Sequence, residues 1–278
     1  DHIKYMKKVK DIGFDILEFQ AQPLLEMTNE HMDEMKKAAA DLGIELTYSL
    51  GLDPYYDISS RDEATRLRGV EYLKNIVERV GYMGGKVISG VSYQGWGCTD
   101  VDPVEGKKPL LENSLKSMRE LVKVAADNDI TYCVEAVNRF EGCLINTAQE
   151  ALDYVNAVNS PNIGILLDTY HMNIEESSFS EAIHLAGDKL VNFHTGDNNR
   201  RCPGRGHIDF DEIFKALGDI HYTGRIVSEP FIATGGEVGN AVALWRDLEP
   251  DMSPEYRDKE AAYLLQYEKE KLAKYGLA

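Results

Sequence analysis

The feature that most constrains this chain is a repeat of short apolar runs, each followed by a longer stretch with helical spacing. The runs recur about every 27 to 45 residues, as DILEF (15–19), ELTYSLG (45–51), KVISGV (86–91), TYCVEAV (131–137), IGILLDT (163–169), LVNFHTG (190–196) and RIVSEPF (225–231). Apolar strands that alternate with helices are typical of a parallel sheet covered on both faces. We therefore predict an α/β fold, either doubly wound or closed into a (β/α)8 TIM barrel.

The number of runs bears on the completeness of the barrel. A parallel barrel has eight strands, whereas seven runs are visible and the chain opens on an amphipathic helix, HIKYMKKVKDIG (2–13). We expect a first strand to be missing from the given chain; the alternative is a seven-stranded or open sheet. No linker or low-complexity segment divides the sequence, so we predict one barrel domain over 1–278, with a C-terminal helix at 253–275 closing or flanking it.

Several helices have recognisable ends. Thr28 precedes NEHMDEMKKAAADL and Gly43 follows it, which predicts an N-cap and a left-handed C-terminal stop. Thr147 precedes AQEALDYVNAV, and Ser160-Pro161 closes that helix.

Composition excludes several function classes. Of the 278 residues, 43% are hydrophobic and 28% charged, close to globular averages. No apolar run is long enough to span a bilayer, and the charged start is unlike a secretory leader, so we expect a cytoplasmic protein. The formal charge of −17 opposes binding to nucleic acid. The cysteines form no CxxC pair and are expected to be reduced thiols: Cys98, Cys133, Cys143 and Cys202.

Potential metal ligands stand near the C-terminal end of each of the last four runs. Their spacings of 33, 26 and 35 residues match one βα unit apiece, and the residues are Glu135, Asp168, His194 and Glu229. The carboxyl ends of barrel strands meet at one face, where barrel enzymes build their active sites. Three carboxylates and one imidazole suit Mn²⁺ or Mg²⁺, with Co²⁺ tolerated, better than a thiolate zinc site.

Each of these residues also has a structural interpretation. Asp168 alone is more often the N-cap of the next helix. Glu135 could be a satisfied polar group at a strand end, and His194 a structural histidine. Capping does not require an acid or a histidine at every repeat, so the four together favour a metal site.

Further candidates flank the predicted site. Glu141 and His171 follow two of the ligand strands, and Arg200 and Arg205 follow His194 in GDNNRRCPGRGH. Their charged or polar groups can bind hydroxyls or a carbonyl of a ligand, although a solvated loop is the alternative for both arginines. Trp96 in SYQGWGC is either a wall for a sugar face or a core residue. We expect surface or packing roles for His31, His184, His207 and His221.

The sequence resembles the ketose 3-epimerases, the D-tagatose and D-psicose (allulose) 3-epimerases of the xylose isomerase-like barrel superfamily. The resemblance rests on VNRFEGCLINTAQEALDYV, LLDTYHMNIEE, HTGDNNRRCPGRG, SEPF, GGEVG and WRDL. It implies a Mn²⁺- or Co²⁺-dependent enzyme that inverts C3 of a free ketose through a cis-enediolate. It also implies that the four ligand residues hold the metal and that Glu135 and Glu229 move the proton. The positions implied to hold the sugar are Glu141, His171, Arg200 and Trp96.

The chain departs from the family pattern in two places. It has HTGD, with Asp197, where HTGE or HLGE is usual, and SYQGWGCTD where a YSYWP-like segment is common. These departures leave the choice of sugar open between the D-psicose/D-fructose and D-tagatose/D-sorbose pairs, pentoses and modified sugars. By analogy with the family we expect a homodimer or homotetramer.

Three other functions compete with a ketose 3-epimerase. An aldose–ketose isomerase, or a related lyase, would use the same barrel and metal site. A barrel nuclease should carry more histidines and a basic face. A metal-stabilised sugar-binding protein would have no need for the second glutamate.

Overall fold

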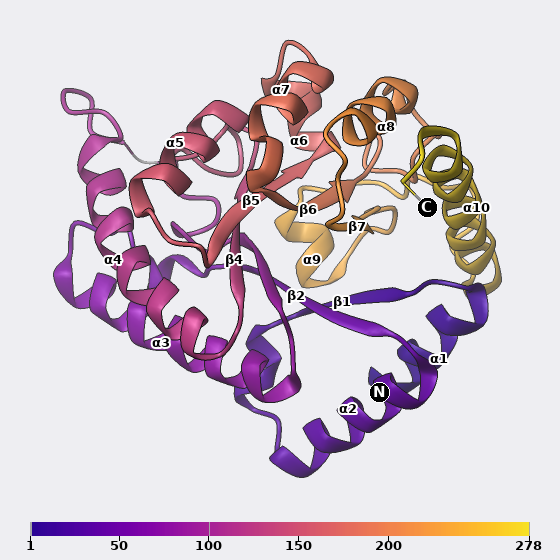
Figure 1. The fold of residues 1–278 in the computed structure, drawn as a ribbon, viewed down its shortest axis with the longest axis horizontal. Helices are drawn as coiled ribbons and strands as arrows, with labels where there is room; N and C mark the ends of the chain where they lie inside the picture. Colours follow the sequence, from indigo (N-terminus) through magenta and orange to yellow (C-terminus); the bar gives the residue numbers. More distant parts are fainter. Residues whose placement is uncertain (1, 100, 278) are drawn as a thin grey trace.

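The computed structural model, which describes residues 2–99 and 101–277, is built around one parallel sheet (Figure 1). Seven strands are found among these residues, and each pairs in parallel with the next along the chain. They are β1 (Ile16–Gln20), β2 (Glu45–Gly51), β3 (Val87–Val91), β4 (Thr131–Ala136), β5 (Ile163–Asp168), β6 (Leu190–Thr195) and β7 (Arg225–Ser228). A doubly wound sheet reverses its strand order at a switch point. The unreversed order confirms the barrel and shows that the doubly wound alternative is wrong.

Side chains from strands that are not neighbours meet across the curled sheet. Arg225 at the start of β7 pairs with Glu45 at the start of β2 at 2.6 Å. Asn192 on β6 donates a hydrogen bond to Ser89 on β3 at 2.7 Å. A cavity of about 590 Å³ separates β1 from β7 and is also lined by the C-terminal helix. The further strand expected from the sequence stays a prediction.

Helices surround the sheet (Figure 1). The α-helices are α1 (His2–Ile12), α2 (Asn29–Leu42), α3 (Glu63–Met83), α4 (Lys108–Asp127), α5 (Ala148–Val158), α6 (Thr169–Glu175), α7 (Phe179–Ala186), α8 (Phe210–Asp219), α9 (Gly236–Ala241) and α10 (Pro254–Tyr275). Short 3₁₀ turns occur at Gln22–Leu25, Pro54–Tyr56 and Gly187–Lys189. Helix α10 packs against both α1 and α8, so the first and last helices of the described chain lie side by side. None of the described helices has the length and apolar content that crossing a bilayer requires.

The helix ends follow the residues expected from the sequence. Thr28 accepts a hydrogen bond from the His31 N–H and begins α2, and Gly43 ends it with a φ of 63°. Thr147 caps α5 in the same way, and Asn159 in the left-handed conformation ends it just before Ser160-Pro161. Local capping groups therefore place these helix boundaries.

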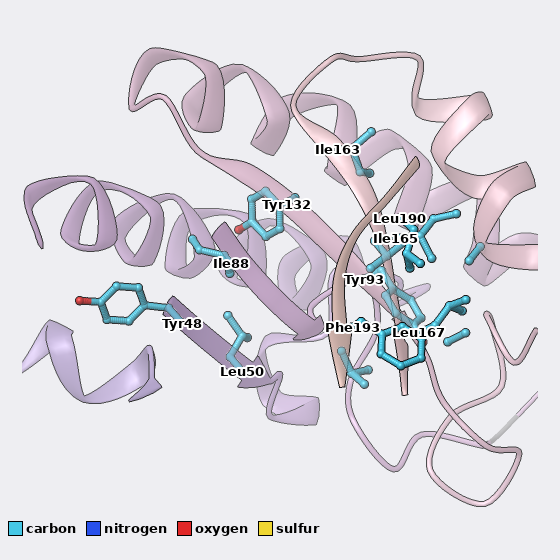
Figure 2. Close-up of a cluster of buried hydrophobic side chains, with 14 of the residues drawn as sticks. Tyr48, Leu50, Ile88, Tyr93, Tyr132, Ile163, Ile165, Leu167, Leu190 and Phe193 are labelled. Atoms are coloured by element: carbon cyan, nitrogen blue, oxygen red, sulfur yellow. The ribbon is translucent and has the colours of Figure 1, made fainter. Parts of the chain in front are cut away.

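The core lies between the sheet and the helices. Tyr48, Ile88, Tyr132 and Ile163 are paired in register across β2 to β5, and all four are buried. Figure 2 shows them in the hydrophobic cluster with Leu167, which is also on β5, and Phe193 from β6. Because successive side chains on a strand alternate between its two faces, the intervening residues point into the barrel. No disulfide links the cysteines of the described residues, in line with the prediction of reduced thiols.

A buried carboxylate attaches α10 to the barrel. Glu268 is 7% exposed and accepts hydrogen bonds from the hydroxyls of Thr195 at 2.5 Å and Ser228 at 2.8 Å. Burial raises the pKa of Glu268 above its ordinary value of 4.5, although these two hydroxyls oppose the shift. The ionised form of this group therefore disfavours the folded state.

We expect Glu268→Gln to relieve a loss of stability that grows with pH. The folded pKa of Glu268 is raised, so the unfolded chain releases this proton first, and the free energy of unfolding falls as pH rises from about 4.5 through the folded pKa. The amide removes this loss while keeping an oxygen that can accept both hydroxyl hydrogen bonds. Urea unfolding at pH 4 and pH 8 should show the variant gaining relative to the native chain only at the higher pH.

The exposed Glu270 on the same helix provides the control. Glu270→Gln should follow the native chain at both pH values. A Glu268→Gln variant that is less stable than the native chain at pH 8 would contradict the expectation.

Candidate metal centre and active site

The four predicted ligand residues converge at the C-terminal end of the barrel. Each offers one ligand atom, and these atoms lie within 4.8 Å of one another: Glu135 on β4, Asp168 on β5, His194 on β6 and Glu229 directly after β7. The first three are buried and Glu229 is half-buried. Parallel register produces this convergence, since His194 pairs with Asp168 on one side and with Val227 on the other.

Two atoms of this cluster lack the partners that buried polar atoms need. Asp168 uses Oδ1 to accept the Tyr170 N–H at 2.6 Å, so it does cap α6, but its Oδ2 is buried without a hydrogen bond. His194 Nδ1 is likewise unpartnered and lies 3.7 Å from Glu229 Oε2. A cation between the four residues would satisfy both atoms. The arrangement therefore fits a metal ion, and Asp168 serves as a cap as well as a candidate ligand.

The electrostatics of the cluster also favour positive charge. Burial raises the pKa of Glu135 well above 4.5 and also raises the pKa of Asp168. Burial alone would lower the pKa of His194, but the carboxylates of Glu18 and Glu229 raise it well above 6.5. A divalent cation removes the repulsion among the acids and suits a set of oxygen ligands with one imidazole.

Glu18 on β1 is a member of the site that the sequence analysis missed. Its Oε1 lies 3.0 Å from His194 Nε2, and its Oε2 accepts the Thr47 hydroxyl at 3.0 Å. Burial opposes ionisation of Glu18, yet His194 and nearby hydroxyls lower its pKa. A carboxylate on one imidazole nitrogen orients the ring and leaves the other nitrogen for the metal. Glu18 therefore leaves Nδ1 as the nitrogen of His194 that faces the cluster.

The predicted sugar-binding residues line the same cavity. This cavity holds about 680 Å³ and includes three of the metal-site residues, Glu135, His194 and Glu229. All four candidates border it: Trp96, Glu141, His171 and Arg200. Trp96 donates its indole N–H to Glu141 Oε2 at 3.3 Å, and its half-buried ring borders the cavity and also packs against the hydrophobic core. Gly51 allows this placement, because a Cβ there would lie 2.9 Å from the Trp96 ring.

Arg200 is held at the cavity by unusual local geometry. Its φ is 65°, its guanidinium lies 3.7 Å from the centre of the Tyr170 ring, and its Nη2 donates to Glu141 Oε1 at 3.0 Å. The side chain is 6% exposed, and its Nε has no hydrogen-bond partner. Buried Arg200 therefore brings both positive charge and a spare donor to the cavity.

The neighbouring arginines have a different role. Arg201 forms a two-pronged ion pair with Glu249, and Arg205 forms one with Glu260. Both pairs tie the loop that carries Arg200 to the C-terminal part of the chain. Arg205 is not among the described residues that line the cavity, so its predicted contact with the ligand is not seen. Its guanidinium is held by Glu260 and does not lie free in a solvated loop, so Arg205 is a structural anchor.

The remaining residues singled out in the sequence lie outside the cavity. Asp197 is fully buried and accepts hydrogen bonds from the backbone N–H groups of Asn198, Gly206 and Ile208. This aspartate, one of the departures from the family pattern, therefore stabilises the loop backbone. His184, His207 and His221 are exposed and His31 is half-exposed, in line with the surface roles expected for them.

Comparison with known proteins agrees with this geometry. The family model for the xylose isomerase-like TIM barrel matches residues 6–258. The chain is 39% identical to the D-psicose 3-epimerase of Ruminiclostridium cellulolyticum, over 96% of this chain and 91% of that protein. It belongs to the xylose isomerase-like barrels, among the ketose 3-epimerases. The chain is therefore an isomerase.

Other relatives and solved structures support the same placement. The chain is 34% identical over 248 residues to the L-ribulose 3-epimerase of Mesorhizobium japonicum, covering 88% of this chain and 82% of that one. A crystal structure of the D-psicose 3-epimerase of Clostridium cellulolyticum H10 with D-tagatose superposes with a TM-score of 0.94 and 39% identity, covering 98% and 94% of the two chains. An L-ribulose 3-epimerase structure gives 0.88 at 30% identity, covering 99% and 89%.

We expect Glu18→Gln to weaken metal binding. The amide keeps the size of the side chain but removes the charge that orients His194, a change that typically costs about 10- to 100-fold in metal affinity. Titration calorimetry of the metal-free protein with Mn²⁺ measures the effect directly. Glu45→Gln on the neighbouring strand, whose partner is Arg225, should bind like the native chain. Equal affinity in the Glu18 variant and the native chain would refute the role assigned to Glu18.

Proposed function

We propose that this protein is a divalent-metal-dependent ketose 3-epimerase that inverts C3 of a free ketose. The observation that carries the proposal is the pair Glu135 and Glu229, from β4 and from the end of β7, within one cluster that also contains Asp168 and His194. An inversion needs one proton-transfer group on each face of the reacting carbon, and two carboxylates from well-separated strands meet that need. The names of the relatives, D-psicose 3-epimerase and L-ribulose 3-epimerase, support the substrate class.

The proposed metal is Mn²⁺ or Co²⁺, with Mg²⁺ less favoured. It would be held by Glu135, Asp168, His194 and Glu229, of which Asp168 and His194 offer buried atoms without a hydrogen-bond partner. When bound, it would supply Lewis-acid stabilisation of the negative charge that develops on the substrate oxygens.

The proton transfer is assigned to the two glutamates. The C3 proton of a ketose is weakly acidic because the adjacent C2 carbonyl accepts the charge, giving a cis-enediolate of the sugar. In the proposed mechanism one of Glu135 and Glu229 removes this proton and the other returns a proton to the opposite face. The roles exchange in the reverse reaction.

The other cavity residues are proposed to hold the sugar. Arg200 and His171 can donate hydrogen bonds, Glu141 can accept them, and the Trp96 ring can pack against a sugar face. Among the described residues that line the cavity, Arg200 is the one lysine or arginine, and it is already paired with Glu141. This distribution favours a free sugar over a phosphorylated one. A cytoplasmic location and a homodimeric or homotetrameric assembly stay predictions.

The first test is isotope exchange. We expect the protein with Mn²⁺ in D₂O to place deuterium at C3 of D-fructose, D-psicose or D-tagatose while forming the C3 epimer, and ¹H NMR follows both changes. An EDTA-treated sample should do neither. Deuterium at C1 with formation of an aldose would replace the proposal with an aldose–ketose isomerase. No exchange in any of the three sugars would count against these ketohexoses as substrates.

The second test separates catalysis from binding. Glu135→Gln and Glu229→Gln should each lower kcat by on the order of 10² to 10⁴, because each removes one acid–base group. Metal content and circular dichroism should be measured on the same samples, since both residues are also proposed ligands. Glu105→Gln on the exposed loop after β3 provides a glutamate control. A Glu229 variant that keeps its metal and its full turnover would refute the acid–base role of Glu229, whereas a native chain that binds the sugar without turning it over would fit a sugar-binding protein and not an epimerase.

A further inference from the structure

Asn138 contacts two of the proposed sugar-binding residues at once. It follows β4 by two residues and is 1% exposed. Its side-chain Nδ2 lies 2.8 Å from His171 Nδ1 and 3.0 Å from Glu141 Oε1. One buried amide therefore faces both a histidine and a glutamate of the cavity.

The orientation of this amide is fixed by a third contact. Asn138 Oδ1 accepts the backbone N–H of Phe140 at 2.9 Å. A backbone N–H can only donate, so the atom facing it is the amide oxygen. The NH₂ group must then face His171 and Glu141, and it can donate one hydrogen to each.

This orientation decides where His171 carries its proton. The ring Nδ1 faces two donors, the Asn138 NH₂ and the Asn138 backbone N–H at 3.2 Å. A nitrogen that accepts from two N–H groups carries a lone pair, so the proton of the neutral ring is on Nε2. That nitrogen lies 3.5 Å from Glu135 Oε1 at the cavity. Because Nδ1 accepts these two hydrogen bonds and carries no proton of its own, the ring is neutral.

The same amide helps to set Glu141 as an acceptor. Glu141 Oε1 receives hydrogens from Asn138 and from Arg200, and Oε2 receives one from Trp96. These donors hold the carboxylate in place. The lone pairs that they leave free can accept from a hydroxyl.

We propose that Asn138 is a positioning residue that fixes His171 as its Nε2–H tautomer and orients Glu141, so that the cavity presents one neutral donor and one acceptor to the sugar. His171 then donates to a sugar oxygen beside Glu135, and Glu141 accepts from a sugar hydroxyl. The part that concerns the sugar rests on the proposed function, whereas the tautomer of His171 is a property of the protein alone.

Asn138→Asp is the informative substitution. Aspartate keeps the oxygen that accepts the Phe140 N–H, but it replaces the NH₂ donor with a second oxygen. The Nδ1 atom of His171 then faces a carboxylate oxygen as well as the backbone N–H that remains. The full negative charge of this carboxylate should draw a proton to Nδ1, and Glu141 meets a like charge. A mispositioned cavity group costs on the order of 10²-fold, and we expect a loss of this size in kcat/KM.

Asn146 supplies the matched control. It lies in the same loop, and its Nδ2 donates to the carbonyls of Val137 and Gly142 without contacting His171 or Glu141. Asn146→Ala therefore removes structural hydrogen bonds from the loop while leaving the cavity residues their partners. If Asn138 served only the loop, the two variants would behave alike.

The experiment combines a tautomer measurement with kinetics. Two-bond ¹H–¹⁵N spectra of the protein labelled at histidine nitrogen report the protonation of each ring, and His171→Gln identifies the relevant signals. We expect the Nε2–H pattern in the native chain and in Asn146→Ala. In Asn138→Asp we expect a proton on Nδ1 together with the loss in kcat/KM on D-psicose.

Each contrary outcome is distinct. A native His171 with a proton on Nδ1 overturns the proposal, as does an Asn138→Asp variant with unchanged spectra or undiminished kcat/KM. An equal loss in Asn146→Ala reduces Asn138 to a loop residue. If the native protein turns over no ketose, the proposed function fails while the spectra still decide the tautomer.

Discussion

The gathering of three carboxylates, two of them buried and one half-buried, beside one imidazole is the constraint on which the rest of this site depends. Like charges that share a site cannot all remain ionised without nearby positive charge. The chain provides part of that charge through His194, whose pKa is raised by its acidic neighbours, and part through Arg200. The unpartnered Asp168 Oδ2 and His194 Nδ1 define the remaining deficit. The surrounding polar contacts, including those of Glu18, hold the ring and the loops in the arrangement that a cation completes.

Much of the fold could be predicted because parallel strands covered on both faces are apolar along most of their length. The predicted runs coincide with the strands to within a few residues. The clearest difference is at RIVSEPF, where β7 ends at Ser228, shortly before Pro230, a residue that has no N–H to donate to the ladder. The polar side chains inside the barrel were harder to predict from the sequence, because Glu18 and Asn192 each lie between apolar residues that point to the opposite face of the strand.

The metal-site residues were accessible from sequence because one βα repeat separates each from the next and parallel register brings strand ends together. Loop residues offered no such regularity. Asn138 and Arg205 lie in loops after β4 and β6, and whether either side chain turns toward the cavity depends on partners far away, such as His171 and Glu260. Glu18 could have been suspected as an acid within an apolar run, but its partner lies five strands away across the barrel.

The ion pairs of Arg201 and Arg205 set an order in which the cavity can be completed during synthesis. The last of the clustered acids is residue 229, but the glutamates that hold the arginine loop are residues 249 and 260. A ribosome must therefore release nearly the whole chain before both ion pairs that anchor the Arg200 loop can form. The acids of the cavity are made first and the anchors of the Arg200 loop last, so the nascent chain carries an incomplete cavity until its C-terminal helix has emerged.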